Sequence, residues 1–504
     1  MHYHCTRDSQ QTVSAAQAIA QGISENGGLF VPESFPQYTH ADLEVMAGCT
    51  YQERAVKILG DFLTDFSKEE IEDCVAQAYA PEKFSGGNPA PLSLVQNGAV
   101  HMYLLELWHG PTCAFKDMAL QLLPHLLTRS VSKTGSGKTS VILVATSGDT
   151  GKAALEGFKD VVGTRILTFY PENGVSPMQK RQMCTQEGGN VGVCAIEGNF
   201  DDAQTGVKRI FTDPAMRDRL ASHNMAFSSA NSINWGRLLP QIVYYFSAYC
   251  DLIRTGEIDY AGEQVNVVVP TGNFGNILAA YYARKMGLPV KRLICASNSN
   301  NVLTDFLRTG VYDRNRPFYT TMSPSMDILV SSNLERLLYD MTGCDDAKVS
   351  GWMRELSETG RYQVDGDLLE KLRALFYAGY CGEKDTLRTI RELYRTENYL
   401  CDPHTAVAVD VYRQYVEETG DSATPSIVAS TASPYKFADS VLRAVSDGPA
   451  AGESEFDKVA ELSALTGTQI PAPIAALQDK AVRFEDSCAP QEMDRAVLRL
   501  LGIG

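Results

Sequence analysis

Short apolar runs alternate with longer amphipathic stretches along most of the chain after residue 100. Many of these runs are apolar at every position rather than at every second one, which is typical of strands that helices cover on both faces. The predicted strands span residues 100–107, 140–146, 165–170, 191–196, 265–270, 292–297 and 426–430. This alternation predicts parallel sheets in an α/β fold, in which ligands bind beyond the carboxyl ends of the strands.

Three segments lack this alternation: residues 1–80, residues 348–396 and the residues after about 446. Residues 1–80 are predicted to be mainly helical, with a capping-box pattern from Ser67 to Glu70 ahead of an apolar stripe, and residues 25–32 predict a turn that leads into a short strand. Residues 348–396 are predicted as a charge-rich helical block. Residues after about 446 are predicted as a tail with a linker-like start followed by helices. We assign no chemistry to these segments.

Composition and charge argue against several classes of function, namely nucleic-acid binding, metal binding and membrane association. A chain of 504 residues suggests about three domains. The net charge is 45 − 61 = −16, which argues against a nucleic-acid partner because such proteins present a basic face. The 12 cysteines are scattered and form no C-x-x-C pair, so we expect reduced thiols, no metal site and a cytoplasmic location. The start of the chain has no signal-peptide pattern, and no apolar run approaches the roughly 20 residues that span a bilayer, so we expect no membrane association.

Lys116 is the first candidate for chemistry. It lies where an apolar run, residues 103–108, has ended in a turn and helix-forming sequence begins at Met118. Its preceding neighbours are apolar, and Asp117 is the one adjacent acid. An amine held in an apolar pocket loses affinity for its proton and can attack an aldehyde, so Lys116 is a candidate Schiff-base lysine. The alternative is a surface lysine at a helix start, with Asp117 as an ordinary first-turn acid.

Two glycine-rich turns follow predicted strands and precede predicted helices. The first consists of Thr146, Ser147, Gly148, Asp149 and Thr150. Its hydroxyl groups and the helix start behind it predict a site for a carboxylate or phosphate, and simple capping of the helix by Ser147 or Asp149 is the alternative. The second consists of Gly272, Asn273, Phe274, Gly275 and Asn276. It predicts a phosphate cradle, although it has neither Walker A nor G-x-G-x-x-G spacing.

Three further groups of polar residues have both functional and structural interpretations. Asn231, Asn234 and Arg237 recur every three residues, so a helix would place them near one face. The planar guanidinium of Arg237 suits a phosphate. The alternative is that Arg237 pairs with an acid and that the asparagines are caps. Asp201 and Asp202 could be a metal pair, but no histidine stands near them and we favour helix capping. His404 could titrate, and we favour a hydrogen-bonded structural role for it.

Taken together, these stretches resemble the threonine synthase family, whose motifs occur here in the family's order. The matching stretches include residues 109–119, 144–154, 173–207, 231–241, 267–280, 402–406 and 427–437. Five residues depart from the family's usual ones: Asn26, Asn301, Asp305, Ser433 and Tyr435. The last two replace a histidine and an alanine near Thr431, which affects the expected shape of the site but not the expected cofactor.

The resemblance implies a role for each candidate. Lys116 would carry pyridoxal 5′-phosphate as a Schiff base and move protons as general base and acid. The turn at 272–276 would hold the cofactor phosphate, and the hydroxyl of Thr431 would face the pyridine nitrogen. The turn at 146–150 would hold the substrate α-carboxylate. We expect Asn234 and Arg237 in the pocket for the substrate phosphate.

The resemblance also implies the fold and the reaction. The fold would be that of a fold-type II enzyme, with two doubly wound α/β sheet domains, the active site between them and a helical N-terminal segment. The expected bounds are 1–95 for the N-terminal domain, 96–111 with 236–445 for the large cofactor-binding domain, 112–235 for a small domain that could close over substrate, and 446–504 for the tail.

The implied activity is conversion of O-phospho-L-homoserine and water to L-threonine and phosphate, by γ-elimination and β-addition, in a monomeric protein. Two alternatives remain open. One is a lyase on the same fold that releases 2-oxobutyrate, and the other is a non-catalytic protein that has kept the fold.

Overall fold

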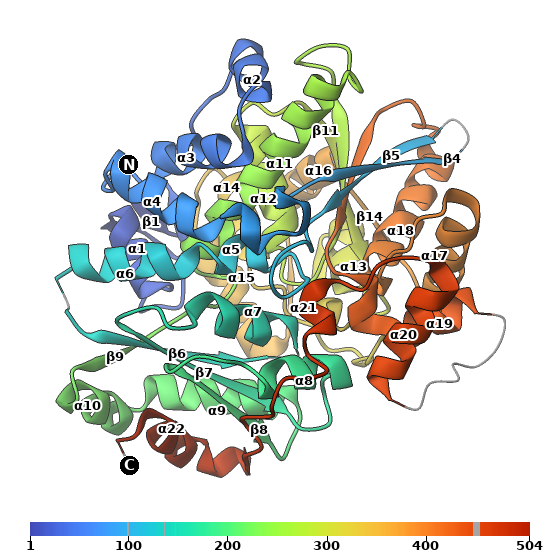
Figure 1. Ribbon diagram of the computed structural model, residues 1–504. Coiled ribbons are helices and arrows are strands. Elements are labelled where there is room, and N and C mark those ends of the chain that lie inside the picture. Colours follow the sequence, from blue (N-terminus) through green and yellow to red (C-terminus); the bar gives the residue numbers. More distant parts are fainter. Residues whose placement is uncertain (98–99, 136, 147, 447–453, 504) are drawn as a thin grey trace.

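The computed structural model describes the chain except residues 98–99, 136, 147, 447–453 and 504 (Figure 1). The N-terminal part holds a small antiparallel sheet of order β2-β1-β3, formed by β1 (Tyr3–Cys5), β2 (Asp8–Val13) and β3 (Phe30–Pro32). Its helices are α1 (Ala15–Gln21), α2 (His40–Ala47), α3 (Tyr51–Phe62) and α4 (Lys68–Ala78). The predicted capping box is confirmed, because the Ser67 hydroxyl accepts from the N–H of Glu70 at 3.2 Å and the Glu70 carboxylate accepts from the N–H of Ser67 at 2.7 Å.

The large sheet has six strands in the order β14-β11-β10-β15-β5-β4. They are β4 (Leu92–Asn97), β5 (Val100–Glu106), β10 (Val265–Pro270), β11 (Val290–Ser297), β14 (Phe376–Tyr380) and β15 (Ser426–Ser430). All of its neighbouring strands run parallel except the β4–β5 pair. The charge-rich helical block predicted over 348–396 is mostly helical, but two short strands interrupt it, β13 (Arg361–Gln363) and β14. β14 lies inside it as the edge strand, between α16 (Gly366–Leu375) and α17 (Glu383–Glu397), and no turn residue separates it from α16.

The small sheet has the order β16-β8-β7-β6-β9. Its strands are β6 (Thr139–Ala145), β7 (Thr164–Pro171), β8 (Val191–Ile196), β9 (Met225–Ser228) and β16 (Ser487–Cys488). The helices beside it include α6 (Leu123–Lys133), α7 (Asp149–Phe158), α8 (Pro177–Cys184), α9 (Phe200–Thr212) and α10 (Pro214–Ser222).

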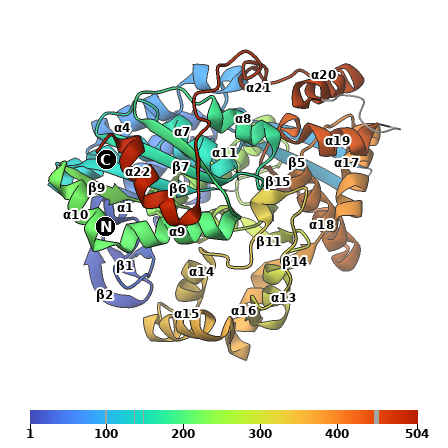
Figure 2. The ribbon, with the colours of Figure 1, turned by 90° about the horizontal axis from the view of Figure 1, so that it is seen from below.

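The last residues of the chain, from β16 onward, are part of the small sheet rather than a tail. β16 pairs in parallel with β8, and α22 (Met493–Leu501) lies beside α9 in both ribbon views (Figures 1 and 2). Buried side chains of α22, such as Val497, pack in one apolar cluster with Val141 and Leu143 of β6. The tail prediction fails here because a strand of two residues carries no readable pattern.

A long buried helix passes through the centre of the molecule. α11 (Trp235–Thr255) is buried at every residue from 235 to 252, and it packs on α12 (Gly275–Lys285), α3, α2 and α5 (Asp117–Leu120). A helix that is apolar on all sides belongs in a core, and this one carries Arg237 into it. The remaining longer helices are α13 (Val302–Thr309), α14 (Leu334–Met341), α15 (Asp346–Thr359), α18 (Pro403–Thr419), α19 (Ala438–Val445) and α20 (Glu455–Thr466).

The architecture is the predicted α/β class, with two mainly parallel sheets and a helical N-terminal segment. The proposed domain bounds stay a prediction. In the part of the chain that the structure describes, no helix combines the length and apolarity needed to cross a bilayer.

Candidate active site

Three predicted site segments follow three adjacent parallel strands of the large sheet. β15 pairs with both β5 and β10, and Lys116, Thr431 and the 272–276 turn come after the carboxyl ends of β5, β15 and β10. The N–H of Phe115 donates to the carbonyl oxygen of Thr431 at 2.8 Å, so Lys116 and Thr431 are neighbours. Adjacent strands lie about 4.8 Å apart, which puts the ends of β5 and β10 roughly 10 Å from each other. One small molecule can therefore reach all three segments.

Lys116 stands at the predicted turn-to-helix boundary, directly before α5. The turn is held by Asp117, whose buried carboxylate accepts from the N–H of Thr112 at 2.8 Å and from its hydroxyl at 2.7 Å. Asp117 is thus a structural brace, and burial raises its pKa to about 6. The Lys116 ammonium lies 4.5 Å from the centre of the Phe115 ring. Burial lowers the pKa of Lys116 to about 8, against the opposing effect of Asp149. The amine is therefore neutral far more readily than an exposed lysine.

The second glycine turn presents unpaired donors. Phe274 adopts a left-handed backbone, φ 64°, directly before α12. The first backbone bond into this helix runs from Leu278 to Phe274 at 3.0 Å, so the preceding N–H groups, 272–277, have no acceptor among the described residues. An added Cβ on Gly275 would meet nothing closer than 3.5 Å. Successive free N–H groups at a helix start, with space before them, form an anion site.

Asn276 extends this donor set. Its side-chain oxygen accepts from the hydroxyl of Tyr244 at 2.8 Å and from that of Tyr245, which fixes the orientation of the amide. The amide nitrogen is buried and has no partner among the described residues. A buried polar atom without a partner is costly, and an incoming acceptor would remove that cost.

Arg237 and Asn234 differ in how their polar atoms are used. The Arg237 guanidinium is buried, donates from Nη1 to the carbonyl oxygen of Ala230 at 2.7 Å, and has no partner for Nε among the described residues. Burial lowers its pKa to about 10. Asn234 caps α11, because its Oδ1 accepts from the N–H of Gly236 at 2.9 Å and its amide nitrogen donates to two backbone carbonyls at 2.9 and 3.0 Å. The contacts of Asn234 favour its structural interpretation as a helix cap. The guanidinium of Arg237, by contrast, keeps donors available for an anion.

In the first glycine turn, the hydroxyl group of Thr146 already accepts from two of the backbone N–H groups. The Thr146 side chain accepts from the N–H of Gly148 at 3.0 Å and from that of Gly151 at 2.9 Å. The N–H groups of Asp149 and Thr150 have no acceptor among the described residues. Ser147, which we predicted as a substrate contact, lies outside the described residues.

Sequence analysis assigned no role to Lys436, which the structure places against Asp149. Its buried ammonium pairs with the Asp149 carboxylate at 2.6 Å and donates to the carbonyl oxygen of Thr112 at 3.0 Å. Asp149 also accepts from the amide of Gln179 at 3.0 Å and from the hydroxyl of Ser325 at 3.3 Å. Burial would raise the pKa of Asp149, but Lys436 and Lys116 outweigh that effect and hold it well below its usual range. The only signal in the sequence was that Lys436 and Gln179 fall inside stretches that resemble the family.

His404 is a hydrogen-bonded structural histidine, as predicted. Its Nδ1 lies 2.6 Å from the Asp402 carboxylate, and its Nε2 accepts from the N–H of Ser325 at 3.1 Å. The capping interpretation of Asp202 is also confirmed, because its carboxylate accepts from the N–H of Asn199 at 2.8 Å. Within the described ranges, no cluster of histidine, cysteine and acidic side chains could hold a metal ion.

The two departures near Thr431 have structural roles around the short helix η4 (Pro434–Phe437). Ser433 is buried and caps this helix by accepting from the N–H of Tyr435. The Tyr435 hydroxyl donates to the carbonyl oxygen of Thr468 at 2.8 Å, beyond the end of α20. These residues therefore position η4, which carries Lys436.

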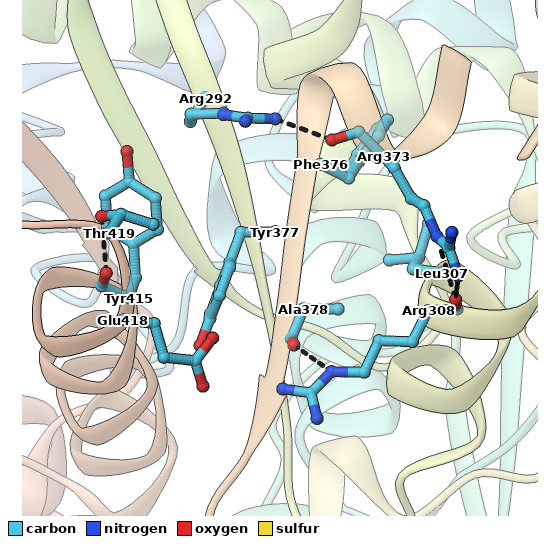
Figure 3. Close-up of a pocket in the computed structure, with 10 residues that line it drawn as sticks. All are labelled: Arg292, Leu307, Arg308, Arg373, Phe376, Tyr377, Ala378, Tyr415, Glu418 and Thr419. Atoms are coloured by element: carbon cyan, nitrogen blue, oxygen red, sulfur yellow. Dashed lines mark hydrogen bonds between the residues drawn. The ribbon is translucent and has the colours of Figure 1, made fainter. Parts of the chain in front are cut away.

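A separate cavity of about 340 Å³ lies at the other end of the large sheet (Figure 3). The glycine turn follows the carboxyl end of β10, whereas the cavity residue Arg292 pairs with Asn266 near the amino end of that strand. Three arginines line the cavity: Arg292, Arg308 and Arg373. Each donates to a backbone carbonyl of this edge, at 2.8, 2.9 and 3.0 Å. They tie α13, α16 and β14 together, and this cavity is not part of the candidate active site.

Comparisons with known proteins cover most of the chain. A family described as threonine synthase N terminus matches residues 2–79, one described as pyridoxal-phosphate dependent enzyme matches 86–375, and one described as threonine synthase, C-terminal matches 405–493. Threonine synthase-like 1 of Homo sapiens is 42% identical over 451 residues, which make up 87% of this chain and 59% of that protein. The chain thus spans about three fifths of the length of that relative.

Two relatives are matched over nearly their whole length. Threonine synthase of Saccharomyces cerevisiae is 36% identical over 470 residues, 88% of this chain and 89% of that protein. The crystal structure of threonine synthase with bound pyridoxal phosphate from Brucella melitensis superposes with a TM-score of 0.86 at 36% identity and covers 99% of both chains. The chain therefore belongs to the threonine synthase family of pyridoxal-phosphate-dependent enzymes.

Proposed function

We propose that this protein is a threonine synthase, a lyase that converts O-phospho-L-homoserine and water to L-threonine and phosphate. The observation that carries the proposal is the meeting of Lys116, Thr431 and the 272–276 turn at the ends of three adjacent strands in a chain of this family. The assignment of individual residues below is part of the proposal.

The residues at this edge of the sheet fit pyridoxal phosphate. Lys116 would join the cofactor aldehyde as a Schiff base, since its amine is readily neutral. The free N–H groups of residues 272–277 and the amide nitrogen of Asn276 would hold the phosphate. The Thr431 hydroxyl would face the pyridine nitrogen. When bound, the cofactor supplies an electron sink for carbanion chemistry at the substrate.

Substrate binding would use the remaining free donors. The N–H groups of Asp149 and Thr150, at the start of α7, would hold the α-carboxylate. The Arg237 guanidinium, which has no carboxylate partner among the described residues, would bind the substrate phosphate. Lys116, released from the cofactor, would move the protons at Cα and Cβ as phosphate leaves Cγ and water adds at Cβ.

The test is product formation by purified protein with pyridoxal phosphate and O-phospho-L-homoserine. We expect phosphate and threonine in equal amounts from the wild-type chain. We expect none above background from Lys116→Ala, whose fold is checked by circular dichroism. Borohydride treatment should attach the cofactor to residue 116, which peptide mass analysis identifies. Absence of phosphate release from a folded, cofactor-loaded wild type would refute the proposal.

One alternative activity has a specific observation in its favour. The human relative, at 42% identity, is named threonine synthase-like, whereas the yeast relative named threonine synthase is 36% identical. A lyase on the same fold would release phosphate and 2-oxobutyrate rather than threonine. The same assay separates the two, because lactate dehydrogenase with NADH detects the keto acid and amino-acid analysis detects threonine.

We further propose that the protein is a cytoplasmic monomer. All 12 cysteines, each within the described residues, are unpaired, which suits a reducing compartment. Light scattering on the purified protein should give a mass near 55.2 kDa, and a mass near twice that value would contradict the monomer. Cell fractionation with an antibody to the chain tests the location.

A further inference from the structure

One carboxylate, that of Asp149, serves two lysines. Lys436 is paired with it at 2.6 Å. Lys116 is close enough for Asp149 to raise its proton affinity, and Lys116 in turn favours ionisation of Asp149. The side chain of Lys436 is fully buried and that of Asp149 is 3% exposed, so water screens neither charge. Which lysine holds the carboxylate therefore affects the charge state of Lys116.

The carboxylate is held by groups from both sides of the site. Gln179 lies on α8, beside the small sheet, and Ser325 lies on the short helix η3 (Pro324–Met326). The N–H of Ser325 is itself fixed by Nε2 of His404, and His404 by Asp402. Lys436 is the one cation among these partners, and it is anchored by its second bond to Thr112.

The charges that face Lys116 come from four elements. Asp149 of α7 favours its protonated form, while Arg237 of α11 and Lys436 of η4 oppose protonation. Asp117 of α5 also favours the protonated form, but its carboxylate is engaged by Thr112. The nearby thiol of Cys113 stays neutral, because burial raises its pKa to about 12. Asp149 is therefore the acid whose pairing decides how strongly Lys116 holds a proton.

We propose that Lys436 is a positioning residue that keeps the Asp149 carboxylate on its own ammonium and so leaves the Lys116 nitrogen able to release and accept protons. This inference rests on the proposed role of Lys116 as the cofactor lysine. Without Lys436, Lys116 is the remaining lysine whose charge favours ionisation of Asp149, and the carboxylate would stabilise its protonated form. Lys436 is not required to touch substrate for this role.

The test is a pH titration, followed by absorbance, of the lysine-bound cofactor in the holoenzyme. An opposite charge within about 4–6 Å shifts a pKa by about 1–3 units. We therefore expect the midpoint of Lys436→Met to lie about one unit or more above that of the wild type. Lys436→Arg, which keeps the cation, should titrate near the wild type, and Asp149→Asn should titrate below it. The double variant should lie above Asp149→Asn only by the direct repulsion that Lys436 exerts on Lys116, and therefore below Lys436→Met, because it has no Asp149 carboxylate to stabilise the protonated form.

A matched control separates this role from mere stabilisation. Arg54 and Asp251 form another buried ion pair, at 3.0 Å, between α3 and α11. Arg54→Met should lower the melting temperature as Lys436→Met does, because each removes the buried cation of an ion pair, although Asp251 keeps a second partner, Arg254, at 3.3 Å. It should not move the midpoint of the titration. In activity assays, Lys436→Met should shift the acid limb of the kcat profile upward and leave KM within about twofold.

Each possible result of these titrations either supports or overturns the inference about Lys436. An unchanged midpoint in folded Lys436→Met overturns the inference. If that variant does not fold, Asp149→Asn decides, since a midpoint equal to that of the wild type would show that this carboxylate does not act on Lys116. A wild type that shows no lysine-bound cofactor at all would instead refute the proposed function, which keeps the two failures distinct.

Discussion

At the scale of single residues, the site is distinguished by cations without ordinary partners. Arg237 is buried, and the only hydrogen bond of its guanidinium among the described residues goes to a backbone carbonyl. Lys116 has an aromatic ring rather than an acid as its closest described contact. Buried cations are normally paired with acids. These two are poised for groups that the substrate and cofactor bring.

Arg237→Ala should therefore weaken substrate binding. A hydrogen bond to a charged group contributes about 1.5–3 kcal/mol, which corresponds to a rise in KM for O-phospho-L-homoserine of roughly tenfold to a hundredfold. Arg237→Lys keeps the charge but loses the planar fork, and it should give an intermediate value. Initial rates of phosphate release measure both. An unchanged KM in Arg237→Ala would exclude this residue from the phosphate pocket.

Cofactor loading should report the lowered pKa of Lys116. Only the neutral amine attacks an aldehyde, and with a pKa of about 8 its neutral fraction rises about fivefold from pH 7 to pH 8 and then levels off. The rate at which cofactor-free protein takes up pyridoxal phosphate should follow this curve in stopped-flow absorbance. A rate that still rises tenfold per pH unit between pH 9 and 10 would indicate an ordinary exposed lysine.

At the scale of elements, helix starts and strand ends create the site. Lys116 precedes α5, Asp149 begins α7, Gly275 begins α12, and Asn234 caps α11. Free N–H groups occur at such places because the first turn of a helix has no internal acceptors. Two of these helix starts keep free donors, and α11 uses the side chain of Asn234 to close its own.

Asn234→Ala should consequently act on stability rather than on binding. Loss of a cap costs about 0.5–2 kcal/mol, and in this case two further bonds to backbone carbonyls are lost. We expect a lower melting temperature with KM within about twofold of the wild type. Asn234→Ser, which keeps a capping oxygen, should recover part of the loss. A large rise in KM at an unchanged melting temperature would instead restore Asn234 to the phosphate pocket.

At the scale of the whole molecule, the last residues complete a sheet that begins far earlier in the chain. Met493, Val497 and Leu501 are buried on α22 against the small-sheet cluster. Each such side chain contributes about 1.5–3 kcal/mol when buried. Their sum is comparable with the whole stability of a typical domain, about 5–15 kcal/mol.

A chain ending at Gln478 should therefore lose its cooperative fold or aggregate. Thermal denaturation and size-exclusion chromatography measure this, with full-length Met493→Leu as the control, because a volume-conserving change costs less than about 1.5 kcal/mol. A truncated chain that melts like the full-length protein would show that the segment is a tail after all.

Most of the fold was readable from local pattern. β8, β10 and β15 begin and end at the predicted residues, because continuous apolar runs bounded by turns mark buried strands. β4, β9, β14 and β16 of the two main sheets were not predicted, and the last two show why. β14 continues directly from a helix, and β16 is two residues long, so neither carries a signal of its own. Both exist because a neighbouring strand offers them backbone partners.

The sequence by itself determined the α/β class, the helix starts and the turn that carries Lys116, since burial periodicity and capping act over a few residues. Its resemblance to a family also singled out the cofactor. Only the tertiary structure decided that Asn234 is a cap, that Arg237 has no acid partner in the described part of the chain and that Lys436 meets Asp149. Those contacts join segments far apart in the chain, and they depend on the order in which strands pair, which no local pattern encodes.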